Sequence, residues 1–345
     1  MCMGEIPSAF ESDFNKKYGL KSRRIIRMLS ENSRATFSDM AKALGISRQA
    51  VKKRIVKLYQ EFSISNILEL NEDELGLINP HVILIKFKHR PDDSTLIELF
   101  KKSYIPQLVI ATKGSYDLIV YANAVSRSEY VHWDMGMHMS LSKYGISWFS
   151  SEVTHKQLGF FPIRNEALDR TDLPVRYKEI IKLLNSDSSA SFKDLSRKLG
   201  FHLNSVIYAF KNLSNTQYIR RFTIAMRPPK DIILMSFVCK YTPGEDHELN
   251  SARARKAFMS DDKDSLISRY ILCSQLIGSY DFLAIGAFDS LKVARATGVG
   301  YHRQCHKKSG IRMRFASVEK VLIGNMPINS LDTSKEYKTI KWEYD

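Results

Sequence analysis

The amino-acid sequence predicts an α+β protein in which two helix-turn-helix domains of winged-helix-like type alternate with two ferredoxin-like β-α-β-β-α-β domains. Three observations lead to this prediction. A chain of 345 residues is long for a single hydrophobic core. Two pairs of similar segments occur along it in the same order. In each copy a helical pattern comes first, and strand-like and helix-like segments then alternate.

The internal repeat divides the chain into two copies of one unit. The segment FSDMAKALGI, which begins at Phe37, resembles FKDLSRKLGF, which begins at Phe192, and the tetrapeptide Gly-Ser-Tyr-Asp occurs at Gly114 and again at Gly278. Matches this far apart indicate duplication and not a solenoid, whose repeats are about 20 to 50 residues long. The polar segment 165–174 separates the copies. The expected domains are a first helix-turn-helix at 1–70, a first regulatory domain at 78–165, a second helix-turn-helix at 172–227, a second regulatory domain at 230–325 and a C-terminal tail at 326–345.

Charge and composition narrow the partner and the compartment. The 52 lysines and arginines exceed the 37 acidic residues, which leaves a formal net charge of +15 and favours a polyanionic partner. No apolar segment approaches the about 20 residues that span a bilayer, and the N-terminal segment lacks the basic and apolar regions of a signal peptide. The four cysteines form no CxxC pair, which indicates a reducing compartment. We therefore expect a cytoplasmic, nucleoid-associated protein that does not bind membranes.

Local signals for a helix-turn-helix lie between residues 36 and 58. Thr36 or Ser38 is expected to cap one helix, and Gly45 to end it, because glycine adopts a positive φ without steric cost. Ser47 then caps the next helix. A helix, a short turn with glycine and a second helix together predict a helix-turn-helix. The apolar positions of the second of these helices fall at helical spacing: Val51, Ile55 and Leu58.

The outward face of the helix after Ser47 carries the strongest functional signal. Five cations and no acidic residue occur between Arg48 and Lys57, whereas a solvated helix usually alternates charge signs to gain ion pairs. The first residues of such a helix meet base edges in the major groove, so Arg48 and Gln49 suit guanine and adenine, and the lysines suit phosphates. The alternative is a solvated basic face. The DNA contacts expected from this helix are Ser47, Arg48, Gln49, Lys52, Lys53, Arg54 and Lys57.

The second copy has the same helical pattern with a different outward face. A third helix is expected from about Leu203 to Leu213, and Lys211 is its only formal charge. Much of the positive charge of this domain comes after the helix. This copy either contacts DNA weakly or has become structural. Its candidate DNA contacts are Asn204, Ser205, Tyr208 and Lys211.

After each helical third, the order β-α-β-β-α-β is expected, first from the strand HVILIKFK and again from residue 232 to residue 323. With Gly-x-Tyr-Asp at the central hairpin, this organisation resembles the Lrp/AsnC (feast/famine) family of prokaryotic transcription regulators. The segment LGISRQAVKKRIVKL is similar to that family's recognition-helix pattern, whereas the acidic opening usual in the family is missing from the first helix. The matching positions of the recognition-helix pattern are Ser47, Val51, Arg54 and Leu58.

The resemblance has implications for assembly and for ligands. Members usually carry one unit and dimerise through the α+β domain, so two fused units imply an intramolecular pseudo-dimer, and a homo-oligomer, a dimer of chains, is also expected. The family further implies a small amino-acid-like effector beside the Gly-x-Tyr-Asp hairpins. The alternative is structural, because glycine supplies the turn and tyrosine packs the sheet. The effector residues so nominated are Gly114, Tyr116, Asp117, Gly278, Tyr280 and Asp281.

The sequence therefore predicts a non-enzymatic transcription regulator that binds double-stranded DNA specifically, with no cofactor and no metal. His302, Cys305 and His306 share a helical face, but three residues alone do not make a structural metal site. Two alternatives stay open. The architecture also resembles sirohaem decarboxylases, tetrapyrrole enzymes whose Y-x-R-x-H type of run does not occur here. The other alternative is a chromatin-like protein that coats DNA without sequence preference.

Overall fold

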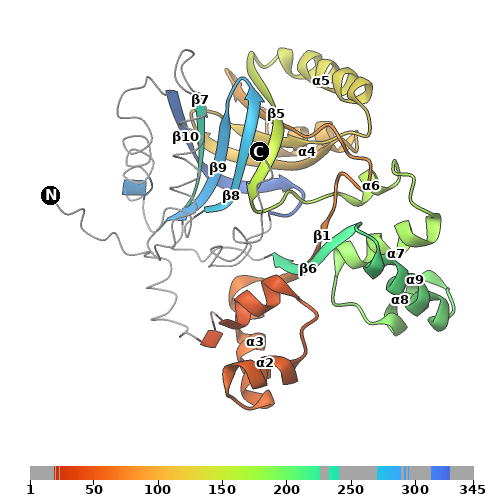
Figure 1. Ribbon diagram of the computed structural model, residues 1–345. Coiled ribbons are helices and arrows are strands. Elements are labelled where there is room, and N and C mark those ends of the chain that lie inside the picture. The colour runs from red at the N-terminus through yellow and green to blue at the C-terminus, as the bar shows by residue number, and fades with distance from the viewer. Residues whose placement is uncertain are drawn as a thin grey trace, which may run out of the picture.

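The computed structural model describes residues 24–225, 233–240, 270–288 and 312–326, together with residues 19, 21, 22, 291, 292 and 294. A closed β-barrel forms one end of the molecule, and two helical units lie at the other end, on either side of a two-stranded ribbon (Figure 1). The mixed α+β class predicted from the sequence is confirmed.

The first helical unit is a helix-turn-helix. Its helices are residues 24–31, α2 (Phe37–Leu44) and α3 (Arg48–Phe62). Thr36 caps α2 by accepting a hydrogen bond from the Asp39 amide, and Gly45 ends the helix at a φ of 60°. Ser47 caps α3 by accepting a hydrogen bond from the Ala50 amide. The predicted caps are confirmed, with Thr36 and not Ser38 at the start of α2.

The second helical unit follows the barrel strand β5. It comprises α6 (Asn165–Leu168), α7 (Val175–Ser186), α8 (Phe192–Leu199) and α9 (Leu203–Asn215). Gly200 ends α8 at a φ of 67°, as Gly45 ends α2, but His202 at the start of α9 makes no capping hydrogen bond with its side chain. Leu195 and Val206 are buried in the core of this unit. Of these helices, α7, α8 and α9 occur where the sequence predicts the helical pattern of the second copy.

The ribbon that separates the helical units consists of β1 (Ser65–Leu70) and β6 (Ile219–Ala225). Each strand follows the last helix of its own unit, and the two strands are antiparallel, with Ile67 opposite Thr223. The main chain therefore joins the two units directly.

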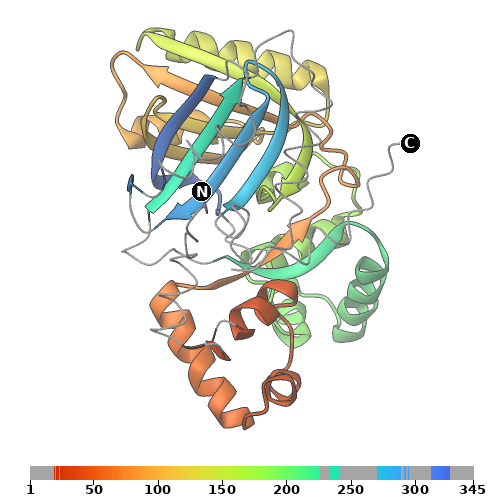
Figure 2. The ribbon, with the colours of Figure 1, turned by 60° about the vertical axis from the view of Figure 1, so that its left-hand side comes forward.

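Eight strands form the barrel, in the order β10-β3-β4-β2-β5-β8-β9-β7. Each half has one internal order, β3-β4-β2-β5 and β8-β9-β7-β10, but the edge strands of the two halves pair with each other, β5 with β8 and β10 with β3 (Figure 2). One closed barrel stands in place of the two separate ferredoxin-like domains expected from the sequence, because mutual pairing satisfies the backbone groups that open edges would leave exposed. The bounds are β2 (His81–Phe87), β3 (Pro106–Gly114), β4 (Leu118–Ala122), β5 (Ile146–Leu158), β7 (Ile233–Lys240), β8 (Tyr270–Gly278), β9 (Phe282–Phe288) and β10 (Arg312–Ile323).

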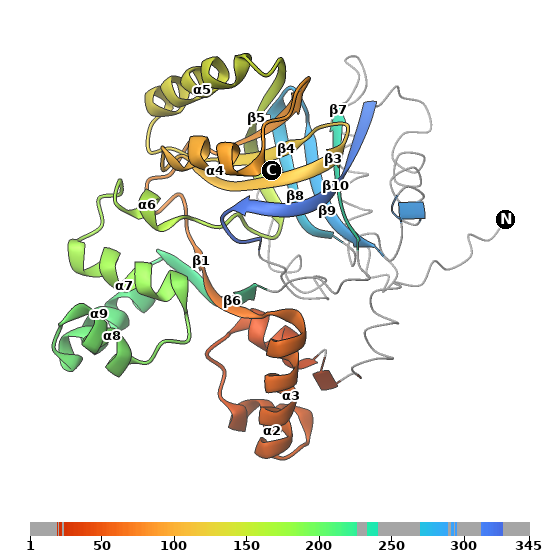
Figure 3. The same cartoon turned by 180° about the vertical axis from the view of Figure 1, so that it is seen from behind.

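Strand β2 shows how the barrel wall is buried on both sides. Val82 and Leu84 belong to an apolar cluster that draws residues from both halves. Ile83 and Ile85 belong to a second cluster beneath α4 (Asp93–Lys101) and α5 (Arg127–Ser142), which cover the outer face of the first half (Figure 3). Successive side chains of a strand point to opposite faces, so a strand buried on both faces has no polar alternation.

Candidate nucleic-acid interface

Helix α3 presents its cations to solvent because its apolar side is fixed inward. Val51, Ile55 and Leu58 are buried in the core of the first unit. In a helix the opposite side then faces outward. All of the DNA contacts predicted on α3 are exposed: Ser47, Arg48, Gln49, Lys52, Lys53, Arg54 and Lys57.

The positive charge of this face is not neutralised within the described part of the chain. The first turn of α3 has no acidic residue, and Lys57 lies 3.8 Å from the Glu61 carboxylate, a long ion pair. The partial positive charge of a helix N-terminus adds to the potential of these side chains. Such a surface favours a polyanion. The cations with no ion-pair partner among the described residues are Arg48, Lys52, Lys53 and Arg54.

Helix α9 occupies the corresponding place in the second unit and presents a polar surface. Tyr208 is 66% exposed, Asn204 and Lys211 are exposed, and Ser205 is half-buried. The sequence-predicted contacts are therefore accessible, except that Ser205 is partly covered. Lys211 is the only formal charge among them.

Several other cations of the second unit and of the ribbon make internal contacts. Arg221 forms an ion pair with Glu69 of β1, and Arg220 donates to Asn71 Oδ1 at 2.9 Å. Arg197 pairs with a carboxylate of its own helix at 2.8 Å. Arg220 and Arg221, two of the cations that follow α9 in the sequence, thus contact β1 and the residue next to it.

The two helical units meet in a buried polar contact. The hydroxyls of Ser33 and Ser188 are hydrogen-bonded at 2.9 Å. The surrounding backbone bonds are reciprocal, since the Ser33 amide donates to the Phe222 carbonyl at 2.9 Å and the Ser188 amide to the Asn66 carbonyl at 3.0 Å. Both serines stand four residues before the matching phenylalanines of the repeat. The contact therefore has approximate two-fold symmetry.

Arg34 is the asymmetric part of this contact. Its guanidinium donates to the carbonyls of Ser188 and Ala190, both at 2.8 Å. Burial lowers the pKa of the guanidinium, while the charge of Asp187 acts in the opposite direction. The equivalent position of the second copy is Ser189. The guanidinium also lies between 4.9 and 5.7 Å from the ring centres of three aromatic residues of the second unit and of β6: Phe192, Phe210 and Phe222.

The two Gly-Ser-Tyr-Asp motifs lie at the seams between the barrel halves. Gly114 is paired with Ala316 of β10, and Gly278 with Ser151 of β5. Their φ angles are 146° and 136°, and a β-carbon on Gly114 would lie 2.6 Å from the carbonyl oxygen of Phe315. Both positions therefore require glycine because the neighbouring strand approaches so closely.

The tyrosines of the motifs are packed inside. Tyr116 is fully buried and donates a hydrogen bond to Ser236 Oγ of the other half at 2.8 Å. The amide of buried Tyr280 donates to Ser151 Oγ of the first half at 2.9 Å. Burial raises the pKa of both phenols above its usual value. Each tyrosine thus links one half of the barrel to the other.

The aspartates of the motifs are held by lysines. Asp117 forms an ion pair with Lys86 at 2.7 Å, and Asp281 forms one with Lys240 at 2.8 Å. Each lysine also donates to the carbonyl of the motif glycine. All six nominated effector residues have structural partners at the seams, and effector binding by them stays a prediction.

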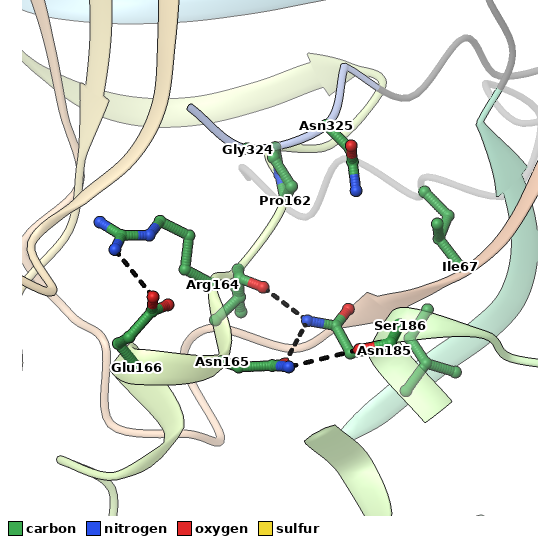
Figure 4. Close-up of a pocket in the computed structure, with 11 residues that line it drawn as sticks. Ile67, Pro162, Arg164, Asn165, Glu166, Asn185, Ser186, Gly324 and Asn325 are labelled. Atoms are coloured by element: carbon green, nitrogen blue, oxygen red, sulfur yellow. Dashed lines mark hydrogen bonds and ion pairs between the residues drawn. The ribbon is translucent and has the colours of Figure 1, made fainter. Parts of the chain in front are cut away.

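A cavity of about 250 Å³ lies where the barrel, the ribbon and the second unit meet (Figure 4). Asn185 in its wall donates to Asn165 Oδ1 at 3.0 Å and to the Ile163 carbonyl, and Arg164 is paired with Glu166. These polar side chains bind one another. None of the predicted effector residues lines the cavity.

Sequence reasoning missed three residues that the tertiary structure uses. Arg34 has no counterpart in the repeat, so repetition did not single it out. Lys86 and Lys240 each end the first apolar strand segment of their copy, HVILIK and ILMSFVCK. This repetition of a lysine at one place in both copies is a signal in the sequence. Their function follows only from the aspartates that they meet.

Two further features concern metals and membranes. Within the described residues, no group of three His, Cys, Asp or Glu side chains is placed to hold a metal ion. A helix with the length and apolar character needed to cross a bilayer does not occur in that part of the chain. His302, Cys305, His306 and residues 327–345 of the C-terminal tail lie outside the described residues.

Comparison with known proteins identifies the first helical unit. Residues 21–59 match the AsnC-type helix-turn-helix domain. This confirms the predicted resemblance for the part of the chain that contains α2 and most of α3. A comparison with curated protein sequences finds no match.

Solved structures are similar to this chain over different lengths. The sirohaem decarboxylase NirDL is 13% identical, with a TM-score of 0.54 over 92% of this chain and 97% of that chain. NirDL in complex with an iron-uroporphyrin III analogue is 14% identical, with a TM-score of 0.53 over 92% and 96%. AsnC of E. coli is 18% identical over 39% of this chain and 91% of its own, with a TM-score of 0.35. At these identities the likeness to NirDL describes the fold.

Proposed function

We propose that this protein is a DNA-binding transcription regulator without enzymatic activity, which binds duplex DNA sequence-specifically through α3. One observation carries the proposal: an AsnC-type helix-turn-helix exposes unneutralised cations on its third helix. Lys52 and Lys53 suit phosphates, and Arg48 and Gln49, in the first turn, suit base edges. The first unit would supply most of the binding free energy.

The wider family assignment is part of the proposal. We infer a tandem-duplicated member of the Lrp/AsnC family, in which two ferredoxin-like halves associate within one chain as a pseudo-dimer. The equal strand order of the halves supports this inference. So do the reciprocal seams and the Ser33–Ser188 contact. A dimer fused in this way presents two non-identical helices, α3 and α9, and would bind an asymmetric site.

An amino-acid-like effector is proposed as a modulator at the barrel seams. A ligand that binds one arrangement of the two halves more tightly than another shifts the population toward it. A thermal-shift screen of amino acids tests this idea, because binding to the folded state alone raises the melting temperature. The shift should disappear in Asp117→Ala and Asp281→Ala variants that remain folded. No stabilisation by any amino acid would leave the motifs with structural roles alone.

DNA binding is tested by fluorescence anisotropy with duplex DNA over a range of salt concentrations. The double variant Lys52→Glu/Lys53→Glu should bind weakly to every sequence, and the slope of log K against log salt should fall by about two, since each phosphate contact contributes about 0.9. The matched control is Lys101→Glu/Lys102→Glu, which reverses the same charge on two adjacent exposed lysines at the end of α4. The control should keep nearly all of the affinity. Equal losses in the two variants would mean that net charge, and not α3, drives binding.

Sequence preference separates a regulator from a DNA-coating protein. Genomic footprinting should show discrete protected sites, whereas a coating protein protects DNA uniformly. Competition with unrelated duplex DNA provides the same distinction in solution, because specific sites are bound about 10³ to 10⁷ times more tightly than non-specific ones. Uniform protection together with equal competition would support the chromatin-like alternative.

A tetrapyrrole enzyme is the second candidate, which the likeness of fold to NirDL favours. The sequence speaks against it in one respect, because the Y-x-R-x-H type of run of those enzymes does not occur in it. Absorption spectroscopy of the purified chain with ferric uroporphyrin III tests this candidate. The regulator should leave the spectrum of the free tetrapyrrole unchanged. A saturable spectral shift, with consumption of sirohaem, would support the enzyme.

A further inference from the structure

Arg314 of β10 extends into the interior of the barrel. Three strands separate β10 from β5 in either direction around the closed sheet. The Arg314 guanidinium nevertheless lies 5.1 Å from the ring centre of Phe149 on β5, and 5.9 Å from that of Tyr280 in the hairpin after β8. A contact between opposite strands of a closed barrel passes through its interior. Since Arg314 is also exposed to solvent, it lies at an open end of the barrel.

This end of the barrel is the one away from the helical units. Beside Arg314, the Phe315 carbonyl accepts a hydrogen bond from the Ser115 amide of the first motif hairpin at 2.9 Å. At the other end of β4, Tyr121 donates to the carboxylate of Glu72, which follows the ribbon strand β1. A molecule bound beside Arg314 therefore need not compete with a duplex on α3.

Cations from both halves gather at this end. Arg312 lies directly opposite Lys240 in the pairing of β10 with β7, and it shares its side of the strand with Arg314 because alternate residues point the same way. Lys86 and Lys240 are ion-paired with the aspartates of the two motifs. Neither arginine has an ion-pair partner among the described residues. We call the end of the barrel that holds these four cations the barrel mouth, and its described part carries an excess of positive charge.

The ring contacts of Arg314 leave its hydrogen-bond donors available. A guanidinium above an aromatic ring gains cation–π attraction, while the N–H groups at its edge can still bind a carboxylate through two hydrogen bonds. The Cα atoms of Arg312 and Arg314 are about 6.6 Å apart, twice the rise per residue of a strand, so the two side chains can hold both carboxylates of one molecule. The mouth of a barrel is a common place for a small ligand. We propose that the barrel mouth binds a small dicarboxylate, with one carboxylate at each arginine.

Both arginines are features of the second copy alone. The pairing of each motif glycine with the other half aligns β10 with β5. In this alignment Arg314 corresponds to Phe149, and Arg312 to Ser147. Because the corresponding residues Arg314 and Phe149 contact each other, they lie close to the approximate two-fold axis of the barrel. One ligand per chain is therefore expected, and the arginines that hold it are not among the residues nominated for the amino-acid-like effector.

Calorimetric titration of the full chain, in a low-salt buffer without phosphate, tests the proposal with succinate, glutarate and adipate. These diacids cover a range of separations between two carboxylates that flexible arginine side chains can hold. At least one of them should bind saturably, with one molecule per chain. Butyrate, which has a single carboxylate, should bind more weakly by about tenfold or more, because the hydrogen bonds of the second carboxylate are lost.

Two variants remove the arginines one at a time. Arg314→Gln should weaken binding of the tightest diacid by about tenfold or more. Arg312→Gln should do the same, and its melting temperature without ligand should equal the wild-type value because the residue is exposed. This second variant keeps the test decisive if the loss of ring contacts destabilises the first. The matched control is Arg176→Gln, which changes an exposed arginine 5.6 Å from the Phe201 ring centre and should bind the diacid as the wild type does.

The absence of saturable binding by any of the three diacids would overturn the proposal. So would butyrate binding as tight as theirs, since one carboxylate would then be enough, or unchanged binding in Arg312→Gln and Arg314→Gln. An equal loss in Arg176→Gln would show a general effect of net charge and would also contradict it. If no diacid binds and both mouth variants lose affinity for duplex DNA, the mouth contacts nucleic acid instead. The titration contains no DNA, so its outcome is independent of the proposed binding of DNA by α3.

Discussion

Helices α3 and α9 follow the same left-handed glycine turn, at Gly45 and Gly200, and yet present different surfaces. Four cations on the face of α3 have no ion-pair partner among the described residues, whereas α9 carries the single cation Lys211, and Arg197, Arg220 and Arg221 near it are engaged by carboxylates or by the ribbon region. A helix gains affinity for DNA from cations that release counterions on binding, and a cation already paired gains less. We therefore infer that, if α3 binds DNA as proposed, the second copy of the same scaffold contributes less to that binding.

Arg34 connects the two helical units. It belongs to the first unit, but the hydrogen bonds and ring contacts of its guanidinium all lie in the second unit and in the ribbon strand β6. The second unit thereby holds the turn between the first helix and α2 of its neighbour. If α3 binds DNA as proposed, this contact fixes the orientation in which the helix is presented.

The largest expected effect is the loss of stability when the contacts of Arg34 are removed. Arg34→Ala removes two hydrogen bonds from a charged group and its ring contacts, so the free energy of unfolding should fall by about 2–4 kcal/mol. Urea denaturation measures the loss. The control is Ser189→Ala at the equivalent position of the second copy, an exposed residue whose loss should cost less than about 0.5 kcal/mol. A negligible effect of Arg34→Ala would mean that the two units are held together by the ribbon alone.

Sequence preference should depend on the first turn of α3. If Arg48 contacts a guanine, Arg48→Ala should reduce discrimination between a footprinted site and its single-base variants by about 1–3 kcal/mol. The same variant should lose little affinity for non-specific DNA beyond one phosphate contact. Competitive binding with systematically altered duplexes measures both quantities. Unchanged discrimination would place the base contacts elsewhere.

The hydrogen bond between the Ser33 and Ser188 hydroxyls should give a measurable coupling free energy. Ser188→Ala leaves the buried Ser33 hydroxyl without its partner, which should cost about 1–3 kcal/mol. Once Ser188 is alanine, Ser33→Ala should cost less than it does in the wild type, because the unpaired hydroxyl is removed. A double-mutant cycle in urea isolates the pairwise free energy. Strictly additive losses would show that the two hydroxyls do not interact.

The smallest expected effect compares single lysines on the two helices. Lys52→Ala should weaken binding by roughly fivefold near physiological salt and reduce the salt slope by about 0.9, the contribution of one phosphate. Lys211→Ala should change both quantities less, since α9 has no further unpaired cation beside it. Anisotropy titrations at matched salt concentrations make the comparison. Equal losses would mean that α9 contacts DNA as α3 does.

The sequence by itself determined the local structure of the helical units and which face of α3 is exposed and cationic. Thr36, Gly45 and Ser47 act through hydrogen bonds and backbone angles within four residues of themselves, so their positions in the sequence are sufficient. The exposed face of α3 follows equally from the spacing of its apolar residues. The repeat indicated two units of the same kind. The two Gly-Ser-Tyr-Asp motifs marked places where the backbone adopts a positive φ.

Only the tertiary structure decided what those motifs do. Tyr116 meets Ser236, Gly114 meets Ala316, and both partners belong to the other half of the barrel. The family resemblance suggested an effector site at these residues, whereas the structure joins the halves there into one closed sheet. The role of Arg34 was likewise invisible, because its partners lie more than 150 residues away. Contacts between distant segments depend on how two units pack together, and periodicity along the chain carries no record of that packing.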